Sequence, residues 1–178
     1  MKTLTIFMIT FLISVVVEGQ EKQPDKVYLH TGDIWKVSVI ELTDTGVKYK
    51  FQGEDLVNNI SKLLVERIEF SSGRTQKITD KVVIEGEADW EKVQITNIAE
   101  EIKGLTRKGE VHSKSTGAWG AASNAKKVYM KAEEKLKKEA AKLGAHSIYM
   151  KDLVVKDGDM MSGQWAKSML SGVAYGYK

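Results

Sequence analysis

The sequence predicts an α+β protein: a small β-barrel of the SH3 or Sm type, followed by an antiparallel sheet packed by one long helix in the order ββαββ. Two observations support this fold class. Short alternating apolar segments separated by turn residues fill 25–80, which is typical of short strands. One apolar stripe with helical spacing occupies 124–143. We therefore divide the chain into a signal peptide at 1–19, a β-barrel-like module at 25–80 and an α+β module at 81–178.

The N-terminus indicates a secretory signal peptide. Lys2 precedes an uncharged, mostly apolar run at 4–17, which Glu18 ends. A membrane-spanning helix needs about 20 apolar residues, whereas a shorter apolar run after a positive start is typical of a cleaved signal. We expect cleavage before Gln20, and hence an exported chain, periplasmic or secreted, without stable membrane insertion.

The charge and cysteine content exclude several classes of function. The formal net charge is only +3, because 27 basic residues are mixed with 24 acidic ones. Arginine occurs only at positions 67, 74 and 107, so the clustered arginine typical of nucleic-acid-binding proteins is missing and we expect no nucleic-acid partner. The chain contains no cysteine, which excludes disulfides and thiolate metal sites.

The first module should consist of short strands joined by turns that contain Gly, Asp or Ser. We expect strands at 26–30, 34–42, 47–51, 67–70 and 75–79. Ser61 should cap one helical turn at 62–65. The strand at 34–42 has apolar side chains on both faces, which predicts a strong bend of the kind found in small barrels.

A longer sequence pattern in this module suggests a relationship. DKVYLHTGDIWKVSVIELTDTGVKYK, followed further on by VERIEFSSG, resembles a module that is common in exported proteins of Bacteroidetes. The resemblance implies an SH3- or Sm-like fold and an exported location. It implies no activity, because that module has no catalytic residues to transfer to this chain.

The second module should place its helix between two pairs of strands. We expect strands near 93–95 and at 108–115, 146–155 and 168–177. The apolar stripe of the helix consists of Val128, Ala132, Leu136, Ala140 and Leu143. Ser123 or Asn124 can cap its start, and Gly144 is placed to end it in a left-handed conformation.

The second module also shows a resemblance. KGEV at 108–111, followed by a helix that ends in AAKLGAHSIYM, is similar to the small envelope domains that include the stress-sensor lipoprotein RcsF and the YbjQ-like domains. In that group a GEV strand precedes a helix closing in AxxLGANAV, and the resemblance implies a shared fold. This chain has His146-Ser147 in place of Asn-Ala and lacks the sensor's lipid-bearing and paired cysteines. The resemblance therefore does not extend to that sensor's signalling route.

The motifs that could support catalysis are incomplete. Ser123 and Lys126 match S-x-x-K, but the other elements that penicillin-binding proteins require are missing, which favours a helix cap. Gly117-Ala118-Trp119-Gly120 precedes the helix and could present N–H groups to an anion. It matches neither a Walker loop nor a dinucleotide fingerprint. We expect no catalytic residues and no enzymatic activity.

The residues that could bind metals are scattered along the sequence. The histidines at positions 30, 112 and 146 have no partner at metal-ligand spacing. The methionines at 150, 160, 161 and 169 suit core packing better than copper ligation. Asp157-Gly158-Asp159 has too few carboxylates for a calcium loop. We expect no metal and no cofactor.

We predict an interaction surface formed by the loops 117–123 and 157–167, which the topology can bring to one end of the second sheet. The candidate residues are Gly117, Trp119, Gly120, Ser123, Met160, Met161 and Trp165. The predicted function is a non-enzymatic binding or interaction protein of the cell envelope, involved in sensing or assembly. Its partner would be an envelope protein or a glycan.

Two alternatives stay open. A small periplasmic hydrolase or peptidoglycan-active enzyme would need a cleft with two or more titratable groups of perturbed pKa. A self-associating structural protein, forming a homo-oligomer, could pair through the apolar strand GVAYGY at 172–177. The aromatic residues distinguish a binding patch from ordinary packing, according to whether they share an exposed face or are buried. They are Trp119, Trp165, Tyr175 and Tyr177.

Overall fold

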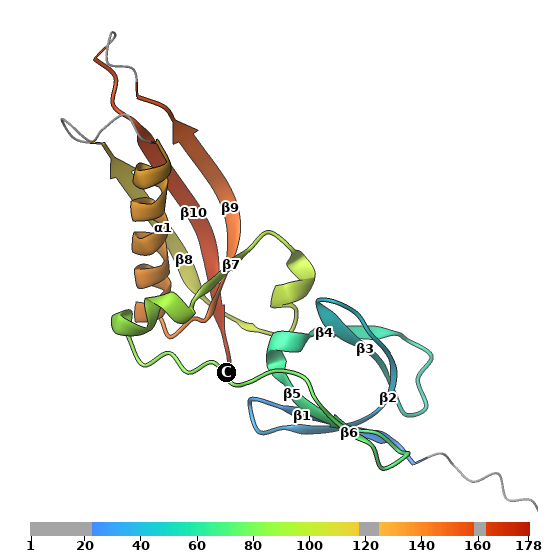
Figure 1. The fold of residues 1–178 in the computed structure, drawn as a ribbon. Helices are drawn as coiled ribbons and strands as arrows, with labels where there is room; N and C mark the ends of the chain where they lie inside the picture. The colour runs from blue at the N-terminus through green and yellow to red at the C-terminus, as the bar shows by residue number, and fades with distance from the viewer. Residues whose placement is uncertain (1–22, 118–124, 159–162) are drawn as a thin grey trace, which may run out of the picture.

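A computed structural model of the chain describes residues 23–117, 125–158 and 163–178. These residues form two sheets and one long helix, which gives the α+β class predicted from the sequence (Figure 1). The predicted signal peptide at 1–19 lies outside the described residues. Among the helices that are described, none has the length and apolar character that a membrane crossing requires.

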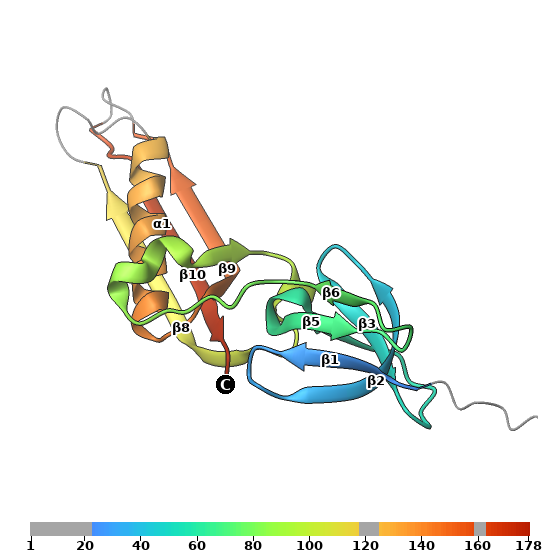
Figure 2. The same cartoon turned by 60° about the horizontal axis from the view of Figure 1, so that its bottom comes forward.

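The first sheet is antiparallel and has six strands in the order β4-β3-β2-β1-β5-β6. The strands are β1 (Asp25–Leu29), β2 (Ile34–Leu42), β3 (Gly46–Phe51), β4 (Asn58–Ser61), β5 (Val65–Glu69) and β6 (Thr75–Lys77). The sheet curls on itself (Figures 1 and 2) but does not close, so the predicted barrel is an open sheet. The 3-10 turn η1 (Lys62–Leu64) lies between β4 and β5 and separates these two strands, which do not pair.

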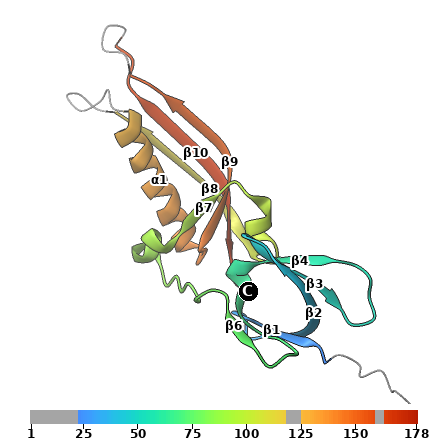
Figure 3. The same cartoon turned by 45° about the vertical axis from the view of Figure 1, so that its right-hand side comes forward.

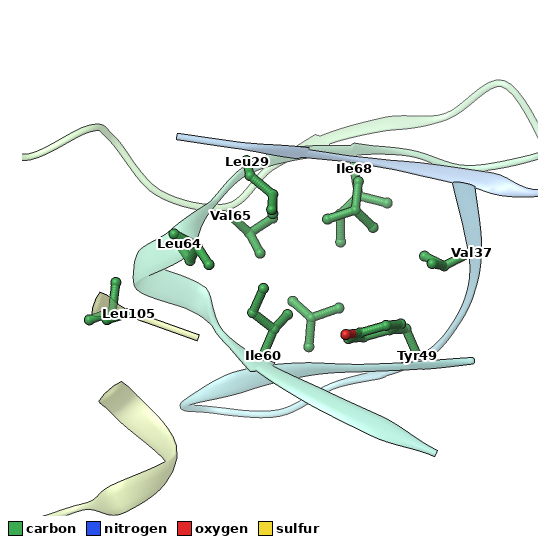
Figure 4. Packing of buried hydrophobic residues seen from close by; sticks show 10 residues of the cluster. Leu29, Val37, Tyr49, Ile60, Leu64, Val65, Ile68 and Leu105 are labelled. Atoms are coloured by element: carbon green, nitrogen blue, oxygen red, sulfur yellow. The ribbon is translucent and has the colours of Figure 1, made fainter. Parts of the chain in front are cut away.

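The curl of this sheet comes from β2 and gives the sheet an interior. The register between β2 and β3 shifts between Val39 and Glu41, and such a bulge bends a strand, as the apolar pattern predicted. The interior is filled by side chains from opposite strands, seen converging in Figure 4. Its members are Val27, Leu29, Val37, Val47, Tyr49, Ile60, Leu64, Val65, Ile68 and Leu105.

Ser61 caps η1 as predicted and also connects the two modules. Its hydroxyl accepts a hydrogen bond from the Leu63 N–H at 3.1 Å and donates one to the Glu101 carbonyl at 2.7 Å. We expect Ser61→Ala to lower the free energy of unfolding by about 1–2 kcal/mol, because both bonds are lost in a buried site. Urea unfolding measures this, and Ser38→Ala, at an exposed serine of β2, is the control. Equal effects of the two substitutions would contradict the bridging role.

The second module has the predicted order of elements. They are β7 (Gln94–Thr96), β8 (Thr106–Thr116), α1 (Ala125–Lys142), β9 (Ser147–Lys156) and β10 (Lys167–Gly176), in the sheet order β7-β9-β10-β8. The sheet is mixed and not antiparallel as predicted, because β7 pairs parallel with β9. After β7 the chain returns through the 3-10 turn η3 (Ala99–Ile102), so that β7 and β8 run in the same direction.

Helix α1 covers one face of this sheet, mainly over β8 and β10 (Figure 1). Its buried side chains are Val128, Ala132, Leu136, Ala140 and Ala141. The predicted stripe is therefore confirmed except for its last member, Leu143, which is 42% exposed. Gly144 follows the helix with a φ of +66°, the left-handed conformation predicted for the residue that ends it.

The end of β10 connects the two modules. Tyr175 and Tyr177 pack partly buried against the core of the first sheet, and Leu105 belongs to that core although it lies in the second module. The strand β10 itself pairs with β8 on one side and β9 on the other. The prediction of edge-to-edge pairing through 172–177 is therefore wrong, because both edges of this strand are already occupied.

Candidate functional site

The face of the second sheet opposite α1 is the first candidate site. In β-strands alternate residues point to opposite faces, and the residues of β8 and β10 that face α1 include Val111 and Leu170. Their sequence neighbours therefore face the other way, where Figure 3 shows no element covering the sheet. We call this the open face and define it by His112, Lys114, Asp152, Val154, Met169 and Ser171.

The open face contains a hollow of about 560 Å³, lined by the six open-face residues together with Ser113 and Leu170. Its apolar part is Met169 and Val154, which are 42% and 44% exposed. Its polar part combines the positive Lys114 with the negative Asp152. A concave site with exposed apolar side chains and a few polar groups is typical of a binding surface.

The polar residues of the open face do not form a catalytic triad. The Ser171 hydroxyl donates a hydrogen bond to Asp152 Oδ2 at 3.2 Å, and His112 lies directly opposite Ser171 on the other side. His112 and Asp152 are therefore two strands apart, about 9.5 Å at the usual strand spacing. In a Ser-His-Asp triad the histidine stands between the other two. The order found here differs from that of a triad, because Asp152 contacts the serine and does not orient the histidine.

The structure brings together the described ends of the two loops predicted as an interaction surface. The Gly117 N–H donates a hydrogen bond to the Ala166 carbonyl at 2.8 Å, next to Trp165, whose side chain is 43% exposed. Gly117 follows the end of β8 and Ala166 precedes the start of β10. These strand ends lie at the end of the sheet that is farther from the first module (Figure 1). The remaining candidates lie outside the described residues: Trp119, Gly120, Ser123, Met160 and Met161.

The described aromatic residues of the second module do not form one exposed face. Tyr175 and Tyr177 pack at the junction with the first module, at the opposite end of β10 from Trp165. They contribute to packing between the modules and not to a binding patch. Trp119 lies outside the described residues.

A second candidate is a stack of three rings between the modules. The Tyr177 ring lies 4.2 Å from the His146 ring and 5.4 Å from the His30 ring, centroid to centroid. The Tyr177 hydroxyl accepts a hydrogen bond from the Val82 N–H at 3.3 Å. His30 Nε2 lies 2.9 Å from Thr79 Oγ1. The stack therefore joins the N-terminal sheet, the segment that links the modules and the C-terminus.

His146 is the most perturbed titratable group of this stack. Its side chain is buried, and its Nε2 has no hydrogen-bond partner among the described residues. Burial lowers the pKa of His146 to about 4, and the positive charges of His30 and Lys108 act in the same direction. Burial also lowers the pKa of His30. These imidazoles are neutral at pH 7 and would be protonated only at a cost in stability.

Neither the hollow nor the ring stack was predicted from the sequence. The hollow depends on the register that sets Ser171 opposite His112 and Asp152. That register could not be read from strands separated by a helix and a loop. The ring stack depends on the contact of His30 with Tyr177, which are 147 positions apart in the sequence. The only signal available in the sequence was that His146 stands at the position of Asn in the pattern AxxLGANAV, which the helix end resembles.

Comparison with known proteins provides no family for this chain. No protein-family model matches it, and a search of curated proteins finds no similar sequence. Within the described residues, no group of three or more His, Asp or Glu side chains is arranged to bind a metal ion.

Proposed function

We propose that this protein is an exported, non-enzymatic interaction protein of the cell envelope, and that it binds its partner on the open face of the second sheet. The observation that supports this most directly is the hollow of about 560 Å³ on the face of the sheet opposite α1, which no helix among the described residues covers. The signal-like N-terminus supports the location. The order Asp152–Ser171–His112 across the strands favours binding over hydrolysis.

The chemistry of the hollow favours a protein segment as the partner. Met169 on the central strand β10 and Val154 beside it on β9 offer apolar surface, and Lys114 on β8 and Asp152 on β9 offer one charge of each sign. A polypeptide can match apolar and charged groups together, and exposed apolar patches with polar rims are typical of protein–protein contacts. We therefore name an envelope protein as the partner.

The two resemblances support the same proposal at the level of fold. In the first sheet, consecutive strands β1 to β4 pair in order and β1 also pairs with β5, which supports an SH3- or Sm-like module. In the second module, the GEV segment lies in β8, and the LGA segment follows α1 and precedes β9. This order supports the relationship to the RcsF and YbjQ-like envelope domains.

The experiment is affinity capture of the tagged protein from crosslinked cells. We expect one envelope protein to be recovered in stoichiometric amount, and Met169→Glu to reduce its recovery at least tenfold, because a charge is placed in the apolar middle of the hollow (~1.4 kcal/mol or more for a residue at the centre of an interface). The matched control is Ile34→Glu, which places the same charge on a side chain of β2 that is 54% exposed. Retained capture by Met169→Glu would contradict the assignment of the open face.

A further inference from the structure

One edge of the second sheet lacks a neighbouring strand. Strand β9 pairs with β10 along nearly its whole length, but its other side pairs with β7 only at Ser147–Tyr149. From Met150 to Lys156, no strand within the described residues occupies that side. Figures 1 and 3 show this half of β9 at the border of the sheet. Its outward N–H and C=O groups are therefore available for pairing with another strand.

The middle of this free edge is apolar. The consecutive residues Leu153, Val154 and Val155 are 52%, 44% and 44% exposed. Because side chains alternate along a strand, Val154 lies on the open face and the other two lie on the face of α1. The helix packs mainly on β8 and β10 and leaves them uncovered. An exposed strand edge with apolar residues on both faces is a template for pairing with a further strand.

The other edges have features that oppose pairing. In the first sheet, the edge strands β4 and β6 have only four and three residues. In the second sheet, β8 is long, but Lys135 of α1 donates a hydrogen bond to the Lys114 carbonyl at 3.3 Å and so places a charged side chain at this edge. Short edge strands and lysines at an edge are the usual protection against pairing.

The sequence of the free edge is complementary to itself. Residues 151–157 read Lys-Asp-Leu-Val-Val-Lys-Asp. If two copies align antiparallel about Val154, Asp152 stands opposite Lys156 of the second copy, and the reverse pair forms at the other end. Leu153 then stands opposite Val155, and Val154 opposite itself. Opposite charges and apolar residues in directly opposed positions stabilise antiparallel pairs, whereas like charges destabilise them.

We propose that the protein forms a two-fold dimer in which the free edges of β9 pair antiparallel, centred on Val154. The partner is a second copy of this chain. The proposal does not require the proposed function, although Asp152 and Val154 also line the hollow of the open face. The two sheets become one sheet in the order β8-β10-β9-β9-β10-β8, and each β7 stays paired with Ser147–Tyr149 of its own β9. Residues directly opposite in an antiparallel pair point to the same face. The two open faces therefore lie on one side of the joined sheet and the two α1 helices on the other.

A single cysteine tests the centre of this pairing. The chain has no cysteine, and directly opposed residues in antiparallel strands have Cα atoms about 4.5–5.5 Å apart, within the range that a disulfide spans. We expect Val154→Cys to form a covalent dimer on mild oxidation of the purified protein. Ile34→Cys, at a residue on β2 that is 54% exposed, should stay monomeric. Equal crosslinking of the two variants, or none at position 154, would overturn the proposal.

A charge exchange tests the register. In the dimer, Asp152→Lys places a lysine opposite Lys156 at both ends of the pairing. Sedimentation equilibrium should therefore give a dimer dissociation constant that is at least about tenfold higher. Adding Lys156→Asp restores opposite charges at both ends. The dissociation constant of the double variant should therefore lie within about threefold of the parent's. Both positions are exposed, so the fold should persist, which circular dichroism checks. A parent that sediments as a monomer, or a double variant as weak as the single one, would refute the pairing.

Discussion

Between pH 7.5 and pH 4, the free energy of unfolding should fall by about 3 kcal/mol because of His146 alone. Its pKa is lowered from the ordinary 6.5 to about 4 in the folded protein. Above pH 6.5 the imidazole is neutral in both states and stability is at its full value. Below pH 6.5 the unfolded chain binds a proton that the folded protein does not, so stability is lost as the pH falls, until about pH 4. At pH 5 the expected loss is about 2 kcal/mol.

Urea unfolding at pH 7.5 and at pH 5 measures this effect. The carboxylates of Asp89 and Glu110 contribute little to the difference in unfolding free energy at pH 5. Hydrogen bonds from Lys92 and Lys151 hold their pKa values below the ordinary range. His146→Leu should remove most of the difference between the two pH values. His112→Gln, at an exposed histidine of the open face, should retain it. A variant at position 146 with the parental pH dependence would show that the acid sensitivity arises elsewhere.

The structural consequence of this titration should be confined to the junction of the modules. The Tyr177 ring packs against both the His146 ring and the His30 ring, tilted by 39° and 55°, respectively. Lys108 and Lys81 lie close enough for their charges to lower the pKa of His146 and of His30, respectively. A proton on His146 therefore meets little water and positive charge. For His30, burial is the main cause of the lowered pKa, and the charges of Glu66 and Asp80 oppose it. We expect acid to loosen the contact of β10 with the first sheet before it affects the core under α1. As the pH falls, hydrogen exchange should therefore speed up first for backbone amides at the junction and later for those of α1.

Gly172→Ala should destabilise the second module by about 3 kcal/mol, at the upper end of the range for overpacking. A Cβ at this position would lie 2.7 Å from the Tyr149 carbonyl oxygen and 2.8 Å from Ile148 Cγ2. The carbonyl oxygen belongs to the backbone of β9 and cannot move without breaking the pairing of β9 with β10. The position also follows a shift in that register, between Ser171 and Gly172, so the close approach is part of the bulge.

Gly109→Ala is the matched control for this substitution. Gly109 lies in β8, also paired with β10, but its added Cβ would meet only the end of the Leu143 side chain, at 3.0 Å. That side chain is partly exposed and can rotate away, so we expect a change within about 1 kcal/mol. Thermal or urea unfolding of both variants gives the comparison. Similar losses at the two positions would mean that loss of glycine itself, and not the contact with β9, determines the cost.

Most of the helix and strands could be predicted because they depend on local patterns. The stripe from Val128 to Ala140 and the glycine that ends α1 lie within a few turns of one helix. The strand β4 was missed because Asn58 and Asn59 lack the apolar alternation on which strand prediction depends. It forms because Ile60 fills the core and the strand pairs with β3.

Of the candidate surfaces, one could be predicted from the sequence and the other could not. The loops around Gly117 and Trp165 were predicted from the order of the elements, and the Gly117–Ala166 hydrogen bond shows that they meet. The hollow could not be predicted, because it depends on which residues of three strands lie side by side. The expectation that 172–177 forms a free edge was wrong for the same reason, since an apolar strand looks alike at the edge and in the interior of a sheet.

By itself, then, the sequence determined the α+β class, the order of β8, α1, β9 and β10, the cap of η1 at Ser61 and the end of α1 before Gly144. These follow from periodicity and from single residues with local effects. Tertiary structure alone decided that the first sheet stays open, that β7 is parallel, that His146 is buried against Tyr177, and that 151–157 forms a free edge. Each of these depends on contacts between residues far apart in the chain. The pattern that makes 151–157 complementary to itself was present in the sequence, and it acquired meaning only when the sheet order left that strand without a neighbour.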